Sequence, residues 1–179
     1  MVVFVWTFTH SFLYVSAEPE AAIFEPVKTL ELVKPSKLAI PSLNILADVQ
    51  HVGLTAKGNM ATPSNFTDVA WYKYGPAPGA SGSAVIAGHL DSGLGFPGVF
   101  KNLIKISKGS EILVTDSEGV TLRFVVTEVN SYPYASVPTE SVFSITGEPR
   151  LALITCGGRW VPGEKTYDRR LVVYADIVT

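Results

Sequence analysis

The sequence predicts a mostly β protein, built as a closed barrel of seven or eight strands with one or two short helices. The 179 residues are 47% hydrophobic and only 17% charged, which is typical of a folded domain with a substantial core. Fifteen glycines and twelve prolines punctuate the chain. The apolar residues between them occur in short runs without the long helical period. Seven or eight runs at this spacing indicate a closed barrel.

Each predicted strand is a short apolar run bounded by turn formers. Segment 38–49 predicts two strands, and Pro41 places the first of them at a sheet edge. The remaining predicted strands cover 69–74, 83–89, 111–115, 120–129, 151–156 and 170–178. The third and fourth of these form a hairpin, and a loop with glycines and a tryptophan separates the last two. Apolar spacing predicts a short helix at 99–106, and 138–143 has room for one helical turn.

The N-terminal part divides into two segments that precede a single domain at 37–179. Residues 2–17 carry no Lys, Arg, Asp or Glu, and a membrane span needs about 20 apolar residues. We interpret 1–17 as a membrane anchor or a secretory signal segment; a buried strand is the third interpretation. Residues 18–36 hold four glutamates and three prolines without amphipathic spacing, which is typical of a linker.

Charge and composition limit the kinds of partner that we expect for the domain. The formal net charge is −2 and no basic cluster occurs, so we expect no nucleic-acid partner. No spacing of His, Cys, Asp and Glu indicates a metal site, and we expect no cofactor.

Cys156 and His89 are the candidate nucleophile and its partner. Cys156 follows the apolar run LALIT and precedes two glycines, so a substrate backbone has room to approach. A thiol needs a nearby base or positive charge, because only a few per cent is thiolate near neutral pH. His89 also ends an apolar strand and opens a glycine-rich loop. The alternatives are that Cys156 is an inert buried thiol and that His89 only satisfies a hydrogen bond of the loop.

Two arginines at the start of the last strand are candidates for stabilising an oxyanion. Arg169 and Arg170 follow Cys156 by 13 and 14 residues. Strand alternation puts them on opposite faces, so only one can point toward Cys156 if the two strands are neighbours. The alternative is that such a pair lies at a solvent-exposed edge of the sheet.

Three segments together resemble the sortase family: SAVIAGHLD at 83–91, LALITCGG at 151–158 and YDRRLVVYA at 167–175. The resemblance extends through most of 38–178. The Thr-Cys-Gly-Gly and Ala-Gly-His-x-Asp forms most resemble class F sortases, with class E as the second choice. A sortase-type barrel is the fold that this resemblance implies.

The resemblance also implies roles and partners. Cys156 would be the nucleophile, His89 the proton donor and Arg170 the oxyanion partner, while Thr155 and Asp91 would contact substrate or orient the loop. The implied substrate is a secreted protein with a C-terminal Leu-Pro-x-Thr-Gly-type sorting signal. The acyl group would pass to an amine of peptidoglycan or of a pilin lysine. The implied location is the extracytoplasmic face of the membrane, with the N-terminal segment as the anchor.

Three other classes compete with this interpretation. The first is another extracytoplasmic Cys–His acyl transferase or hydrolase, such as an L,D-transpeptidase of peptidoglycan. An L,D-transpeptidase places its histidine and cysteine close together in the sequence, whereas here Cys156 follows His89 by 67 residues. A papain-like protease has its cysteine before the histidine. A non-catalytic β-barrel binding module would keep Cys156 as a structural thiol, unreactive and with a raised pKa.

Overall fold

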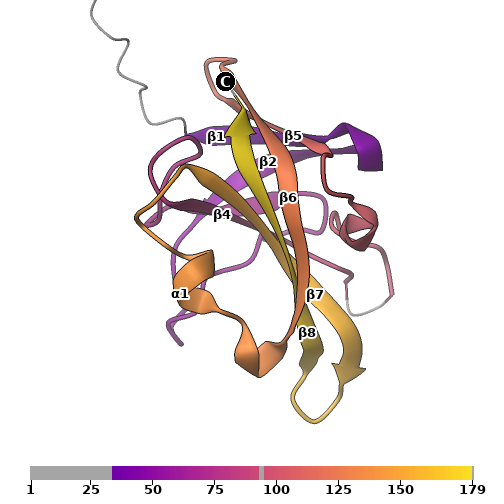
Figure 1. The fold of residues 1–179 in the computed structure, drawn as a ribbon. Coiled ribbons are helices and arrows are strands. Elements are labelled where there is room, and N and C mark those ends of the chain that lie inside the picture. Colours follow the sequence, from indigo (N-terminus) through magenta and orange to yellow (C-terminus); the bar gives the residue numbers. More distant parts are fainter. Residues whose placement is uncertain (1–33, 93–94, 179) are drawn as a thin grey trace, which may run out of the picture.

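The computed structural model describes residues 34–92 and 95–178, and these form one closed eight-stranded barrel (Figure 1). The barrel order is β1-β2-β3-β4-β7-β8-β6-β5. Pairs β2–β3 and β4–β7 are parallel and the other neighbours are antiparallel. The strands are β1 Pro35–Ile40, β2 Ile45–Val52, β3 Val69–Tyr72, β4 Ser83–Gly88, β5 Glu111–Asp116, β6 Thr121–Pro133, β7 Arg150–Val161 and β8 Thr166–Val178.

The predicted fold class is confirmed, with few helical residues in the described part of the chain. One α-helical turn, α1 (Thr139–Val142), lies within the predicted 138–143 segment. Three short 3-10 helices complete the elements: η1 (Pro41–Leu43), η2 (Leu103–Lys105) and η3 (Tyr134–Ser136). The predicted membrane anchor at 1–17, and the linker up to residue 33, lie outside the described residues.

Alternation along the strands divides the apolar side chains between two clusters. Inward-facing residues fill the barrel, with Leu38, Phe100 and Phe124 at most 1% exposed. Outward-facing residues of β4, β7 and β8 pack under α1 and include Val85 and Val172. The outer face of these three strands is therefore covered where α1 lies across it.

Three details of the predicted elements are wrong. Pro41 does not make β1 an edge strand, because it follows the strand in η1 and β1 pairs on both sides, with β2 and β5. The predicted helix at 99–106 is only the 3-10 turn η2. The buried residues of the 99–106 segment, Phe100, Leu103 and Ile106, are three apart, which is the period of a 3-10 helix.

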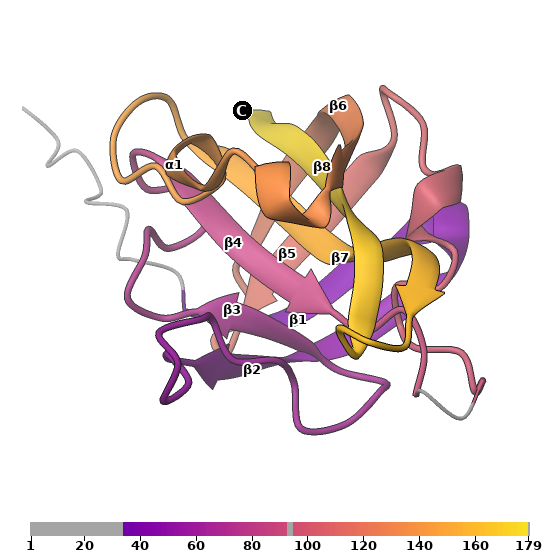
Figure 2. The same cartoon turned by 90° about the horizontal axis from the view of Figure 1, so that it is seen from below.

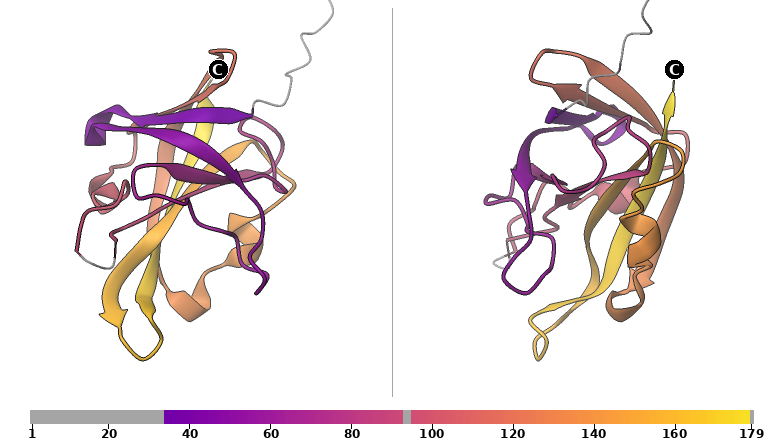
Figure 3. Two further views of the ribbon diagram at one scale, coloured as in Figure 1. Left: turned by 180° about the vertical axis from the view of Figure 1, so that it is seen from behind. Right: turned by 90° about the vertical axis from the view of Figure 1, so that its left-hand side faces the viewer.

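The third correction concerns the end of the cysteine-bearing strand. β7 continues through Cys156 to Val161, and β8 begins at Thr166, so no long loop separates them. The register shifts between Gly157 and Trp160, and this bulge bends the ribbon while pairing resumes at Trp160 and Tyr167. The β7–β8 hairpin consequently projects beyond the barrel (Figure 3).

Candidate active site

Three adjacent strands bring the predicted catalytic residues together. β4, β7 and β8 lie side by side in the barrel order (Figure 2). Cys156 of β7 pairs directly with Arg170 of β8. Ala87 pairs with Ile154 in the parallel β4–β7 ladder, so continuing the register by two residues places His89 beside Cys156. All three catalytic candidates line one pocket of about 610 Å³.

The walls of this pocket come from two connections as well as from the strands. Residues 59–62, between β2 and β3, form one wall. The η3–α1 segment forms another and contributes Tyr134, Val137 and Phe143. The exposed lining is mostly apolar. Its polar side chains include Asn59, Thr62 and Thr139 besides the three catalytic candidates. A pocket of this kind suits a partly apolar ligand that also offers polar groups.

The backbone around His89 is held by close packing. A Cβ atom at Gly88 would lie 2.5 Å from the ring of the buried Phe100, and a Cβ at Gly98 would lie 2.3 Å from the His89 carbonyl oxygen. Glycine at both positions lets the returning loop approach this closely. The Phe100 N–H donates a hydrogen bond of 2.9 Å to the His89 carbonyl. The start of the loop is therefore fixed next to the end of β4.

The His89 ring is oriented by the connection between β2 and β3. Its Nε2 lies 3.0 Å from the Pro63 carbonyl oxygen, and its centroid lies 4.9 Å from that of Phe66. A carbonyl only accepts, so this hydrogen bond places the proton on Nε2. Nδ1 is then the nitrogen that remains for the thiol or the substrate.

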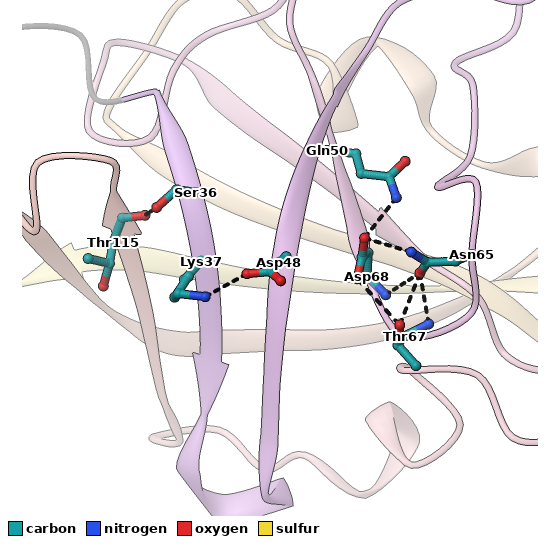
Figure 4. A network of polar contacts seen from close by, with 8 residues as sticks. All are labelled: Ser36, Lys37, Asp48, Gln50, Asn65, Thr67, Asp68 and Thr115. Carbon is teal, nitrogen blue, oxygen red and sulfur yellow. Dashed lines mark hydrogen bonds and ion pairs between the residues drawn. The ribbon is translucent and has the colours of Figure 1, made fainter.

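A polar network holds this connection against β2 (Figure 4). The Gln50 side chain accepts hydrogen bonds from Ser64 and donates one of 2.8 Å to Asp68. Asn65 adds a second donor to the same carboxylate at 2.7 Å. The hydrogen bond from Gln50, followed by that from Asn65, lowers the pKa of Asp68. The network is thus intact with Asp68 ionised, and it fixes the segment that carries Pro63 and Phe66.

The Cys156 thiol is partly buried, and its pKa is raised. Burial is the main cause, the Asp91 carboxylate raises the pKa further, and the Arg170 guanidinium opposes both. The bulge that follows depends on Gly158, whose φ is +78° and whose Cβ would overlap Asp168. Asp168 accepts a 2.8 Å hydrogen bond from the Arg159 N–H across this bulge.

Arg170 is fixed by contacts on two of its nitrogens and on one face. Nη1 donates to the carbonyls of Tyr167 at 3.0 Å and Arg169 at 2.8 Å, and Nη2 donates to Thr166 Oγ1 at 2.9 Å. The Tyr134 ring covers the guanidinium at 4.3 Å. Arginine has five N–H donors, so two, including Nε–H, are left for a substrate oxygen. Arg169 instead donates to Ser131 on β6.

Thr155 and Asp91 lie beside the three catalytic candidates. Thr155 lines the pocket, and its buried hydroxyl donates a 2.8 Å hydrogen bond to the Gly88 carbonyl, linking β7 to the residue before His89. Asp91 accepts a short hydrogen bond from the Tyr167 hydroxyl. The Lys101 ammonium also lies 4.0 Å from its carboxylate. Contact of either residue with substrate remains a prediction.

Sequence reasoning missed Tyr134, Phe66 and Tyr167. Each contacts a predicted site residue, but from a connection or from a hairpin stem whose position depends on the fold. Tyr134 and Phe66 occur among other aromatic residues, and no spacing distinguishes them. Tyr167 lies within the motif YDRRLVVYA, where its place before the arginines was the one available signal.

Within residues 34–92 and 95–178, no group of three or more His, Cys, Asp or Glu side chains could hold a metal ion. Among the helices of the same residues, none has the length and apolar character needed to cross a membrane.

Comparison with known proteins defines the class to which this barrel belongs. The sequence profile of the sortase domain matches residues 38–178. The chain therefore belongs to the sortase family of cysteine transpeptidases. No curated protein sequence matches it significantly.

Solved sortase structures share the fold at low sequence identity. Sortase C-1 from Actinomyces oris is 22% identical with a TM-score of 0.64, over 84% of this chain and 76% of that one. Sortase A from Corynebacterium diphtheriae is 20% identical with a TM-score of 0.60, over 81% and 60%. Sortase A from Listeria monocytogenes is 20% identical with a TM-score of 0.61, over 83% and 89%. The resemblance to class F or class E remains a prediction.

Proposed function

We propose that this sortase cleaves a Leu-Pro-x-Thr-Gly-type sorting signal between Thr and Gly and transfers the acyl group to an amine. The observation that carries the proposal is the convergence of His89, Cys156 and Arg170, from three neighbouring strands, on one pocket. The apolar walls formed by Val137, Phe143 and Ile154 suit the Leu-Pro part of the signal.

In the first half-reaction the Cys156 thiolate attacks the carbonyl carbon of the Thr–Gly amide. A carbon–sulfur bond forms, and the two remaining N–H groups of Arg170 stabilise the oxyanion. The carbon–nitrogen bond then breaks as the His89 imidazolium donates its proton to the leaving amine. The products are a thioester on Cys156, a free glycine amine and a neutral His89. An acceptor amine or water then releases the acyl group.

We place the protein on the extracytoplasmic face of the membrane, with the N-terminal segment as its anchor. The apolar run at 2–17 and the linker composition of 18–36 support this location. The partners are then secreted proteins with a C-terminal sorting signal and an amine from peptidoglycan or a pilin. Fractionation of cells expressing the full chain and a variant lacking 1–17 tests the location. Release of only the truncated variant from the membrane supports it, and identical distributions contradict it.

The test of the activity is a transpeptidation assay with a Leu-Pro-x-Thr-Gly peptide and an amine donor. We expect a product cleaved after threonine and joined to the amine, and no product with Cys156→Ala. Circular dichroism of the variant checks that it is folded. Product formation by folded Cys156→Ala would contradict the assigned nucleophile.

A non-catalytic binding module is the second candidate, and the raised pKa of Cys156 favours it. A structural thiol would be unreactive, whereas Cys156 is partly exposed and lies opposite Arg170. A thiol probe separates the two functions. Labelling of Cys156 in the folded protein supports catalysis. Absence of labelling, together with peptide binding but no cleavage, supports the binding module.

A further inference from the structure

We propose that Tyr134 is a positioning residue, which holds the Arg170 guanidinium in place without neutralising its charge. The guanidinium carbon of Arg170 lies 4.3 Å from the centroid of the Tyr134 ring. Both side chains line the pocket that contains Cys156. The role of Tyr134 in turnover rests on the proposed function, whereas its effect on the charge beside Cys156 is measurable without any substrate.

The hydrogen bonds of Arg170 all stay within its own strand, β8. Nη1 donates to the carbonyls of Tyr167 and Arg169, and Nη2 donates to Thr166 Oγ1. The N–H groups of a guanidinium lie in one plane, so these bonds leave both of its faces uncovered. Tyr134 belongs to η3 and covers one face. The ring therefore limits the out-of-plane movement that the hydrogen bonds permit.

The path of the backbone brings Tyr134 to this position. β6 is antiparallel to β8, and its last two residues, Tyr132 and Pro133, pair with Arg170 and Arg169. Pro133 has a φ of −55°, which its ring fixes, and η3 begins at the next residue. η3 also contacts β8. The chain thus turns into η3 directly after it passes Arg170, so the first residue of η3 reaches the guanidinium.

An aromatic partner leaves the positive charge of Arg170 available. Among the ion pairs of the described residues, none involves Arg170. A carboxylate in place of the ring would neutralise the guanidinium and would compete for the N–H groups that the oxyanion needs. An aromatic face attracts a cation through the ring quadrupole and leaves its charge unchanged. Arg170 is therefore held in place while its charge still acts on Cys156.

The reactivity of the Cys156 thiol reports the position of this charge. The titratable and charged groups that face the thiol are His89 and Asp91, which follow β4, and Tyr167 and Arg170 of β8. Arg170 lowers the thiol pKa, against the effect of burial. Without the ring, the guanidinium samples positions farther from the sulfur. The thiol pKa then rises, and a higher pH is needed to form the thiolate.

The first experiment is alkylation by iodoacetamide as a function of pH, on the full chain without substrate. In Tyr134→Leu we expect the midpoint of the profile to rise by about half a pH unit. The midpoint is compared, and not the rate, because removal of the ring also changes access to the thiol. Tyr134→Gln, a second variant without a ring, should give the same rise. Tyr134→Phe keeps the ring and should restore the wild-type midpoint. Circular dichroism checks that each variant is folded.

Two controls separate this effect from a general change in structure. In the Arg170→Gln background, Tyr134→Leu should leave the midpoint unchanged, because no guanidinium is left to hold. Tyr74→Leu is the matched tyrosine variant and should have the wild-type midpoint. Tyr74 is also exposed and lies 5.2 Å from a cation, Lys73 Nζ, but it does not line the pocket.

The second experiment measures turnover of a Leu-Pro-x-Thr-Gly peptide. In Tyr134→Leu we expect kcat to fall about fivefold, since a loosened guanidinium stabilises the oxyanion less well. KM should change by less than about twofold, because the ring acts through Arg170 and not on bound substrate. Tyr134→Phe should restore kcat to within about twofold of the wild-type value.

Each outcome decides for or against the positioning role. An unchanged alkylation midpoint in folded Tyr134→Leu overturns it, and so does an equal rise with and without Arg170. A raised KM at unchanged kcat also overturns it, because the ring would then act in substrate binding. If the wild type cleaves no peptide, the proposed function fails. A rise of the midpoint that requires Arg170 would still support the contact between Tyr134 and Arg170 in that case.

Discussion

At the scale of single residues, burial of Cys156 and the charges around it set the pH at which its thiol reacts. Burial and Asp91 raise the thiol pKa above its ordinary value of 9.0, and Arg170 lowers it. Alkylation by iodoacetamide reports this pKa directly, because Cys156 is the only cysteine of the chain.

We predict opposite shifts of the alkylation profile for two variants. Asp91→Asn removes a negative charge that disfavours the thiolate, so the profile should move to lower pH. Arg170→Gln removes a positive charge that favours the thiolate, so it should move to higher pH. Shifts in the same direction, or none, would contradict the electrostatic account. Measurement at low and high salt is the control, since screening weakens both effects.

The two arginines give a second prediction at this scale. Arg170→Ala should lower turnover about a hundredfold, the usual cost of losing one oxyanion donor. Arg169→Ala should change turnover by less than about threefold, because Arg169 bonds to Ser131 and does not line the pocket that contains Cys156. Steady-state kinetics of both variants checks this. A larger loss in Arg169→Ala would mean that the wrong arginine has been assigned.

The two arginines show which contacts of a single residue can be predicted from the sequence. Strand alternation predicted that one arginine faces Cys156, and the cross-strand pair of Cys156 with Arg170 confirms that geometry. The Tyr134 ring over Arg170 could not be predicted, because Tyr134 reaches it from the connection between β6 and α1. Such contacts depend on the path of a connection and not on local periodicity.

At the scale of elements, the end of β4 depends on a glycine packed against the core. Gly88→Ala would place a Cβ 2.5 Å from the Phe100 ring, which is 1% exposed and has little room to move. We predict a loss of about 1–3 kcal/mol in the free energy of unfolding. Gly163→Ala is the matched control, because a Cβ there meets nothing within 4 Å. Urea denaturation of both variants measures the difference. Equal stabilities would show that the β4 end tolerates a side chain.

The predicted elements were confirmed where the local residue pattern determines the structure, and they were wrong where contacts with other strands determine it. The hairpin of β5 and β6 has its turn residues at the predicted place, with Asp116 accepting hydrogen bonds from Glu118 and Val120. The stretch after Cys156 looks like a loop because glycines lack strand propensity. It is nevertheless a bulge in a continuing strand, because the Trp160–Tyr167 pair extends the ribbon.

At the scale of the whole molecule, the closed barrel makes one cooperative unit. β1 closes the barrel by pairing with both β2 and β5, and its Leu38 side chain is fully buried. We predict that Leu38→Ala lowers the free energy of unfolding by about 2–5 kcal/mol. Unfolding followed by tryptophan fluorescence and by far-UV circular dichroism should still give coincident transitions. Separate transitions would contradict a single core.

The number of strands was predictable from the sequence, but their order around the barrel was not. Turn-forming residues mark where each apolar run ends, so the strands can be counted. β4 and β7, however, are neighbours in the barrel although more than sixty residues lie between them. Local patterns do not encode such a long-range pairing. The meeting of His89 and Cys156 depends on that pair, so the site followed from family resemblance and not from periodicity.

The most direct test of the central claim is intact-protein mass spectrometry of residues 34–179 mixed with a Leu-Pro-x-Thr-Gly peptide. The account predicts a mass increase equal to the acyl fragment ending in threonine, located on Cys156 by peptide mapping and removed by hydroxylamine. Cys156→Ala should show no increase. A cleaved peptide without any adduct on Cys156, or an adduct on another residue, would contradict the assignment of Cys156 as the nucleophile.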